Sequence, residues 1–267
     1  MVRSCSIGVL DSGLGGVSVL KSLVKLMPNE DIIYVGDTKN IPYGGRTKEE
    51  IRKFALRIVE FLILNKCKMI VVACNTASIA ALDYLKGHCN IPIVGIIDAG
   101  VEIVLDGGYK EVSVLCTPFT AKSGDHKRKI NDKNKKIKVN VIGCELLCPM
   151  IEKGWETIEN RDDILDEYMS HVSKTSEALL LACTHYPFIK EEIRKKFSGE
   201  IIVPSDECVR EVYRTLRENS LLNENKKKGN VEFYVTGDVN SFKDKAEKFL
   251  KQKNLEVYKV NLTDIKK

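Results

Sequence analysis

The sequence has no apolar run long enough to cross a membrane. A spanning helix needs roughly 20 apolar residues, and the longest apolar runs here are short, such as 69–74 and 178–183. The run from Ile7 to Leu10 stops at Asp11, so we expect no signal peptide. A cytoplasmic protein without a membrane partner is expected.

The sequence also lacks the cysteine spacings of a disulfide scaffold or a zinc ribbon. It has nine cysteines, an odd number, and no Cys-x-x-Cys motif. Cys144 and Cys148 lie four residues apart, but no second Cys/His pair accompanies them. Because no His/Cys/Asp cluster has metal-ligand spacing in the sequence, we predict no catalytic metal.

Motifs for nucleotide phosphates and nucleic acids are missing as well. Gly13-Leu14-Gly15-Gly16 departs from the dinucleotide fingerprint, because Ser18 stands where the last glycine belongs, and no P-loop follows. The net charge is only +5, from 42 Lys and Arg against 37 Asp and Glu. The basic tract 127–138 contains no aromatic residue. We therefore expect a solvated loop there and no nucleic-acid partner.

The sequence does contain alternating apolar strands and amphipathic helices. Strands are predicted at 6–10, 31–35, 69–73, 92–97, 112–115, 138–142, 178–182, 201–204, 231–236 and 255–260. Helices are predicted at 17–26, 48–65, 76–85, 100–105, 162–172, 188–197, 208–222 and 241–250. This alternation predicts an α/β fold with parallel sheets, and the continuous Val/Ile/Leu strands indicate burial on both faces.

Two segments resemble each other across the chain. Residues 70–76 and 179–185 both read as three apolar residues, Ala, Cys and two polar residues, 109 positions apart. Each places a cysteine, Cys74 or Cys183, just beyond a buried strand, where open α/β sheets bind ligands. A thiolate there can act as a nucleophile or a base. Two matched cysteines predict proton removal on one side of a carbon and proton return on the other; the alternative is two buried structural thiols.

Other polar residues follow predicted strands, and each allows a structural and a functional interpretation. Asp11-Ser12 begins either a capped glycine turn or a carboxylate-binding nest. The loop with Pro42-Tyr43-Gly44 is either a plain turn or an anion site, and composition alone favours the turn. Thr117 and Thr120 either bind substrate or cap a helix. His185 lies two residues past Cys183 and can tune that thiol, whereas surface positions are predicted for His88, His126 and His171.

Together these motifs resemble the cofactor-independent glutamate racemases of bacteria. The resemblance covers almost the whole chain and rests on five motifs in order, at residues 7–16, 36–44, 72–77, 91–95 and 182–187. It implies two similar α/β domains with mostly parallel central sheets and an active site in the cleft between them. The first domain is expected at 1–97 plus about 208–267, and the second at about 98–207. A homodimer is implied, and no cofactor.

The same resemblance assigns roles to residues. Cys74 and Cys183 would be the two bases that move the α-proton of glutamate, and D-glutamate would supply peptidoglycan synthesis. Asp11 and His185 would assist, and Glu152 matches an acidic position near the site. The substrate would be held by Asp11, Ser12, Pro42, Tyr43, Gly44, Asn75, Thr76, Thr117, Thr120, Thr184 and His185.

The sequence departs from the family pattern in places, and two other functions remain open. Asp98-Ala99 stands where the family has Glu-Pro, and Cys144-Glu145 where it has Cys-Pro. One alternative is a related racemase that acts on aspartate, since one methylene is worth only about 1–3 kcal/mol of discrimination. The other is a non-catalytic binding protein on the same scaffold, which would bind ligand without turnover.

Overall fold

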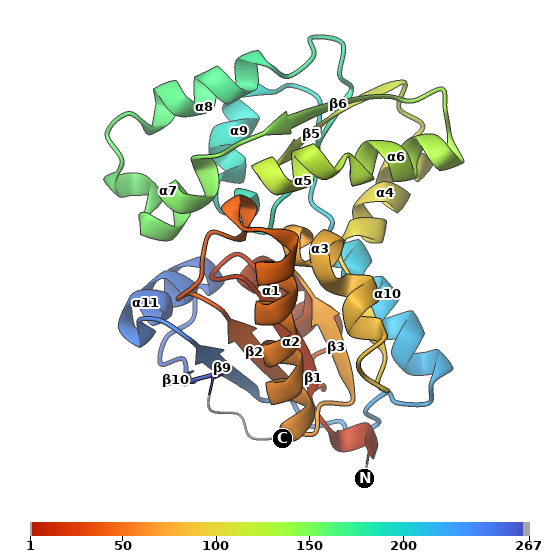
Figure 1. Cartoon of the computed structure of the whole chain (residues 1–267), viewed down its shortest axis with the longest axis vertical. Helices are drawn as coiled ribbons and strands as arrows, with labels where there is room; N and C mark the ends of the chain where they lie inside the picture. The colour runs from red at the N-terminus through yellow and green to blue at the C-terminus, as the bar shows by residue number, and fades with distance from the viewer. Residues whose placement is uncertain (1, 264–267) are drawn as a thin grey trace.

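The chain folds into two lobes, each built on its own parallel sheet, in a computed structural model that describes residues 2–263 (Figure 1). All the strand pairings in both sheets are parallel. The predicted α/β class with parallel sheets is confirmed. Within residues 2–263, no helix combines the length and apolar character that crossing a membrane requires.

The larger sheet has six strands in the order β10-β9-β2-β1-β3-β4. Its strands are β1 (Ile7–Asp11), β2 (Ile32–Gly36), β3 (Met69–Val72), β4 (Ile93–Gly95), β9 (Val231–Val235) and β10 (Val257–Lys259). Every residue of β1, β2 and β3 is buried, as expected for strands covered on both faces. Because β1 lies between β2 and β3, successive crossovers run to opposite sides of it, which opens a ligand crevice beyond its carboxyl end.

The smaller sheet has four strands in the order β6-β5-β7-β8. They are β5 (Glu111–Cys116), β6 (Lys138–Gly143), β7 (Ala178–Ala182) and β8 (Glu200–Ile202). Here β5 lies between β6 and β7, so this sheet has the same kind of crevice next to β5. Cys74 follows β3 and Cys183 follows β7, so both cysteines lie at the carboxyl edges of their sheets.

Helices cover both faces of each sheet. Around the larger sheet lie α1 (Val17–Leu26), α2 (Lys48–Leu64), α3 (Asn75–Lys86), α10 (Ser205–Glu218) and α11 (Val239–Leu250). One core packs α1, α10 and α11 on one face, and a second packs α2 and α3 on the other. Around the smaller sheet lie α4 (Ile97–Asp106), α5 (Pro118–Ser123), α6 (Asp125–Lys133), α7 (Leu147–Lys153), α8 (Arg161–Ser170) and α9 (Lys190–Lys196).

Short 3₁₀ helices complete the chain: η1 (Val2–Ser4), η2 (Tyr43–Gly45), η3 (Trp155–Thr157) and η4 (Tyr186–Ile189). The predicted helix 188–197 is therefore two elements, η4 and α9. Pro187 in the first turn of η4 is compatible with a helix start.

The prediction of a solvated loop at 127–138 is wrong. This tract forms most of α6 and enters β6 at Lys138. Gly124, at φ +68°, adopts the left-handed conformation that ends α5 and lets α6 start at once. The helix is missed in the sequence because only two of its residues, His126 and Ile130, are buried.

The predicted surface position of His126 is also wrong, because His126 lies on the buried face of α6. His126 is 2% exposed, whereas His88 and His171 are exposed as expected. Burial lowers the pKa of His126 to about 4, against the opposing attraction of Asp125. The imidazole is therefore neutral near neutral pH, and its Nδ1 has no hydrogen-bond partner within the described residues.

Candidate active site

A small buried cavity lies where the carboxyl ends of the two sheets meet. Its lining is drawn from both lobes: Ser12, Tyr43, Gly44, Cys74, Asn75, Thr76, Thr117, Cys148, Cys183, Thr184 and His185. The centre of a water molecule can occupy ≈ 10 Å³ inside it. The cavity therefore has room for about one water. The two matched cysteines thus face one enclosed space.

Cys74 is held at the start of α3. Its Sγ accepts a hydrogen bond from the backbone N–H of Ala77 at 3.4 Å, so the thiol takes the place of an N-cap residue. The Sγ also lies 3.6 Å from Ser12 Oγ. Burial and the nearby Asp11 carboxyl raise the pKa of Cys74 to about 12, so this residue is a thiol near neutral pH.

Cys183 lies at the end of β7 in a different electrostatic environment. Burial alone raises its pKa, but hydrogen bonds to Cys148 and His185 and the charge of His185 outweigh burial and bring the pKa to about 5. Its Sγ is 3.8 Å from His185 Nδ1. Cys183 is therefore a thiolate at neutral pH, beside a thiol at Cys74.

His185 connects that thiolate to Glu152. Its Nε2 lies 2.7 Å from Glu152 Oε1, and this same oxygen accepts a hydrogen bond from the backbone N–H of Leu14 at 2.7 Å. Burial opposes the charged imidazole, yet Cys183 and Glu152 raise the pKa of His185 well above its ordinary value. Burial likewise opposes the Glu152 carboxylate, but its bond to His185 lowers its pKa.

Asp11 is fully buried at the end of β1. Its Oδ2 accepts a hydrogen bond from Gly13 N–H at 3.0 Å, and its Oδ1 accepts one from Thr184 Oγ1 at 3.2 Å. Burial raises its pKa to about 6, although His185 pulls the other way. Asp11 thus bridges the two lobes from beneath the cavity lining.

Asn75 and Thr76 present polar atoms at the first turn of α3. Both polar side-chain atoms of Asn75 are buried without a hydrogen-bond partner within the described residues, although such groups are normally satisfied. Thr76 Oγ1 lies 2.9 Å from Thr117 Oγ1 of the other lobe. An unpaired amide at a helix N-terminus is suited to hold a carboxylate.

Most of the sequence-predicted site residues meet at this cavity, and four do not line it. Asp11 and Glu152 lie behind the lining and contact it through Thr184 and His185. Thr120 is buried and bonds Thr117. Pro42 is exposed and precedes Tyr43 in the loop that reaches the cavity.

The sequence pattern does not reveal the role of Cys148 or of the glycines in the loop after β1. Cys148 Sγ lies 3.5 Å from His185 Nδ1; its spacing of four from Glu152 on α7, which brings both to one helix face, was the available signal. A Cβ on Gly15 would collide with Thr184 and His185, and one on Gly13 with Glu152. The glycines permit the close approach of the two lobes.

The comparison with known families decides the classification. The family described as Asp/Glu/hydantoin racemase matches residues 7–212. The chain belongs to this family. A glutamate racemase of Fusobacterium nucleatum is 45% identical over 256 residues, covering 95% of this chain and 97% of the relative.

Solved structures of this racemase family share the fold over its full length. The crystal structure of glutamate racemase from Francisella tularensis in complex with D-glutamate superposes with a TM-score of 0.91 at 38% identity, covering 98% of this chain and 100% of that one. Glutamate racemase from Thermus thermophilus in complex with β-chloro-D-alanine gives 0.87 at 34% identity, with 98% and 99% covered. The predicted family resemblance is confirmed.

Proposed function

We propose that this racemase-family protein interconverts L- and D-glutamate by direct proton transfer between two cysteines. The observation that carries the proposal is the pairing of a thiolate at Cys183 with a thiol at Cys74 on one cavity between the lobes. Curated relatives that this chain matches over nearly its whole length are named glutamate racemase, which supports the choice of substrate.

The reaction follows from the two protonation states. The Cys183 thiolate takes the α-proton from one face of the substrate, and the Cys74 thiol gives its proton to the opposite face. The carbon is inverted, and the two thiols have exchanged protonation states, so the reverse reaction starts from a Cys74 thiolate. The α-hydrogen is a very weak acid, and the enediolate-like carboxylate must be stabilised by prearranged donors, each worth about 10²–10³ in rate.

Donors for that carboxylate are present around the cavity. The N-terminal N–H groups of α3, the free amide of Asn75 and the hydroxyls of Ser12 and Thr76 supply them, whereas the Thr184 hydroxyl donates to Asp11. On the other side, His185 and Glu152 hold Cys183 as a thiolate. Tyr43 and Gly44 close the cavity from the loop after β2, and the Asp11 carboxylate behind the lining attracts the substrate ammonium without touching it.

The lobes must separate for substrate to enter. A cavity with room for about one water does not hold glutamate. Opening would break the contacts that join the lobes, including the bond between Thr76 and Thr117 and that between Leu14 and Glu152. We propose that the lobes are the two domains expected from the sequence, 1–97 plus about 208–267 and about 98–207.

The family resemblance carries three further proposals. These are assembly as a homodimer, a cytoplasmic location and a supply of D-glutamate to peptidoglycan. The first is tested by light scattering of the purified protein.

The activity itself is tested by following the circular dichroism of L-glutamate with purified protein and no added cofactor. The ellipticity is expected to decay to zero, and Cys74→Ala and Cys183→Ala should each abolish the decay. Cys208→Ala, a buried cysteine on α10 outside the cavity, is the matched control. Decay with aspartate but not with glutamate would identify aspartate as the substrate. No decay with either amino acid would favour a non-catalytic binding protein.

A further inference from the structure

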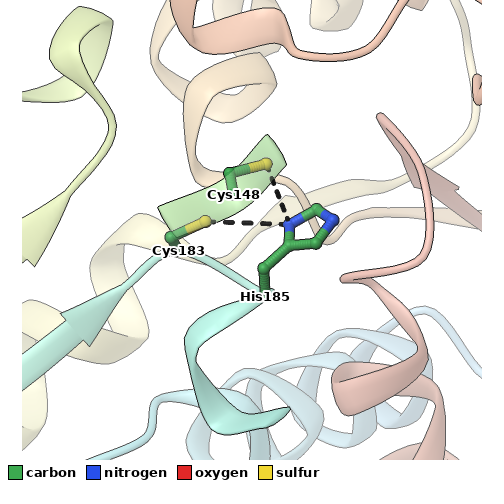
Figure 2. Close-up of side chains that lie close together, drawn as sticks. All are labelled: Cys148, Cys183 and His185. Atoms are coloured by element: carbon green, nitrogen blue, oxygen red, sulfur yellow. Dashed lines mark hydrogen bonds between the residues drawn. The ribbon is translucent and has the colours of Figure 1, made fainter. Parts of the chain in front are cut away.

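Cys148, Cys183 and His185 form a compact group of metal-ligating atoms. Figure 2 shows both sulfur atoms directed at the same ring nitrogen, and the two Sγ atoms and an imidazole nitrogen all lie within 4.8 Å of one another. The two Sγ–Nδ1 distances are 3.5 Å for Cys148 and 3.8 Å for Cys183. Tetrahedral zinc, with bonds of about 2.3 Å to sulfur and 2.0–2.1 Å to nitrogen, separates such atoms by about 3.6 Å.

The surroundings of His185 match those of a metal-ligating histidine. Such a histidine offers one ring nitrogen to the metal and hydrogen-bonds the other to a carboxylate or carbonyl. Here Nδ1 faces the sulfurs, while Nε2 bonds Glu152 Oε1 at 2.7 Å. Glu152 is itself fixed by Leu14 N–H. The ring is thus already oriented for a ligand on the Nδ1 side.

We propose that Cys148, Cys183 and His185 bind one Zn²⁺ ion, which reversibly inhibits the enzyme. Two thiolates and an imidazole are soft and borderline ligands that select zinc over magnesium or calcium. All three residues line the cavity, which has room for about one water as a fourth ligand. Inhibition rests on the proposed function, because the ion would occupy the sulfur that takes the α-proton.

The proton balance of binding is fixed by the three ligands. Before binding, Cys183 and His185 Nδ1 share one proton between them, and the Cys148 thiol carries another. Zinc binding releases both and leaves two thiolates and a neutral imidazole whose Nε2–H still faces Glu152. No oxidant or reductant is needed. Because protons compete with the metal, the apparent affinity should rise as the pH is raised.

Binding is tested directly with Co²⁺ as a spectroscopic substitute, on fully reduced protein in a phosphine reductant. The expected result is a thiolate-to-cobalt charge-transfer band that saturates at one equivalent and disappears when one equivalent of Zn²⁺ is added. Cys148→Ala should weaken binding at least tenfold and reduce the band. Cys144→Ala, which removes a buried cysteine four residues before Cys148 that is not in the group, is the matched control.

Two results would overturn the proposal: no thiolate-to-cobalt band, or a Cys148→Ala variant that binds as tightly as the unchanged protein. Inhibition is then measured with each variant normalised to its own metal-free rate. Zn²⁺ should inhibit the unchanged protein, a chelator should restore it, and Cys148→Ala should need at least tenfold more Zn²⁺.

The binding and activity assays separate the two proposals. A cobalt band in a protein that racemises no amino acid would leave the metal site standing and remove the proposed function. Racemisation by a protein that shows no thiolate-bound metal would refute the metal site and leave the proposed function standing.

Discussion

At the scale of single residues, the site depends on how one buried thiol is charged while another stays neutral. Cys74 and Cys183 are equally buried, so burial alone raises the pKa of both. What separates them is the partner: Asp11 next to Cys74 adds a negative charge, whereas His185 next to Cys183 supplies a positive one. Opposite neighbours therefore create an acid and a base from the same residue type.

Glu152 is expected to act through His185 as a positioning residue. Glu152→Gln removes the negative partner of the imidazolium, so the pKa of His185 falls and that of Cys183 rises. A hydrogen bond to a charged group is worth about 1.5–3 kcal/mol, so kcat should fall about 10- to 100-fold, with a smaller change in KM. The acid limb of the pH–rate profile, in the direction that starts with Cys183, should move to higher pH.

The exposed Glu156, three residues past α7, gives the control Glu156→Gln. An acid limb that stays in place in Glu152→Gln, whatever the loss in rate, would show that Glu152 has only a structural role.

Some residues of the site can be predicted from the sequence, and others cannot. Cys74 and Cys183 are predictable because each carries its own local pattern, a buried strand followed by Ala-Cys and two polar residues. Cys148 is not, because its partner His185 lies 37 residues away and meets it only when α7 packs on η4. The charge states also depend on such tertiary neighbours.

At the scale of elements, the glycine loop between β1 and α1 sets how closely the lobes approach. A Cβ on Gly15 would meet His185 Nδ1 at 2.5 Å and collide with Thr184 Oγ1. His185 is held by Glu152 and has little freedom to move away. Gly15→Ala should therefore lower kcat/KM by about 100-fold, or about 2.7 kcal/mol, while the fold is retained.

Gly45→Ala is the matched control, since a Cβ there meets nothing within 4 Å. Circular dichroism and thermal unfolding check the fold of both variants. Full activity in Gly15→Ala would contradict the close approach of this loop to His185.

The buried His126 on α6 should make the stability of the fold depend on pH. Its pKa is about 4 when folded against an ordinary value of 6.5, so the unfolded chain binds more protons between these values. Stability is fully present above pH 6.5 and is lost as the pH falls toward 4. At pH 5 this residue should cost about 2 kcal/mol relative to neutral pH.

His126→Gln should reduce the loss of unfolding free energy between pH 7.5 and pH 5 by that amount, measured in urea. His88→Gln, at an exposed histidine, controls for removing an imidazole. An equal loss in His126→Gln and the unchanged protein would refute the burial argument.

Elements were predictable where the pattern is strongly apolar. The strand at 178–182 and the helix at 17–26 have the predicted bounds, because continuous apolar runs and helical spacing are local signals. Helices α5, α6 and α7 are not predictable in this way: α5 and α7 are short, and α6 buries only His126 and Ile130, so neither length nor periodicity reveals them.

At the scale of the whole molecule, the cavity is closed and the lobes must open for substrate. The N–H of Leu14, bonded across the lobes to Glu152, should become accessible in the open form. D-glutamate should therefore slow hydrogen exchange in peptides that cover 13–16 and 184–186. Peptides over β9, which β2 separates from β1, serve as the reference.

Unchanged exchange at 13–16 under saturating D-glutamate would argue against opening at this joint. The sequence predicts two α/β halves from their similar strand ends. It does not predict the strand orders or the volume between the lobes, because these depend on packing between segments far apart in the chain.

Racemisation of L-glutamate in deuterium oxide tests whether two thiols act on opposite faces of one carbon. Proton NMR and chiral separation would follow both enantiomers during the first turnovers. D-glutamate should carry deuterium at Cα from the outset, while unreacted L-glutamate keeps its α-proton, because the proton that leaves to Cys183 differs from the one that Cys74 returns. D-glutamate that retains the original α-proton would contradict it.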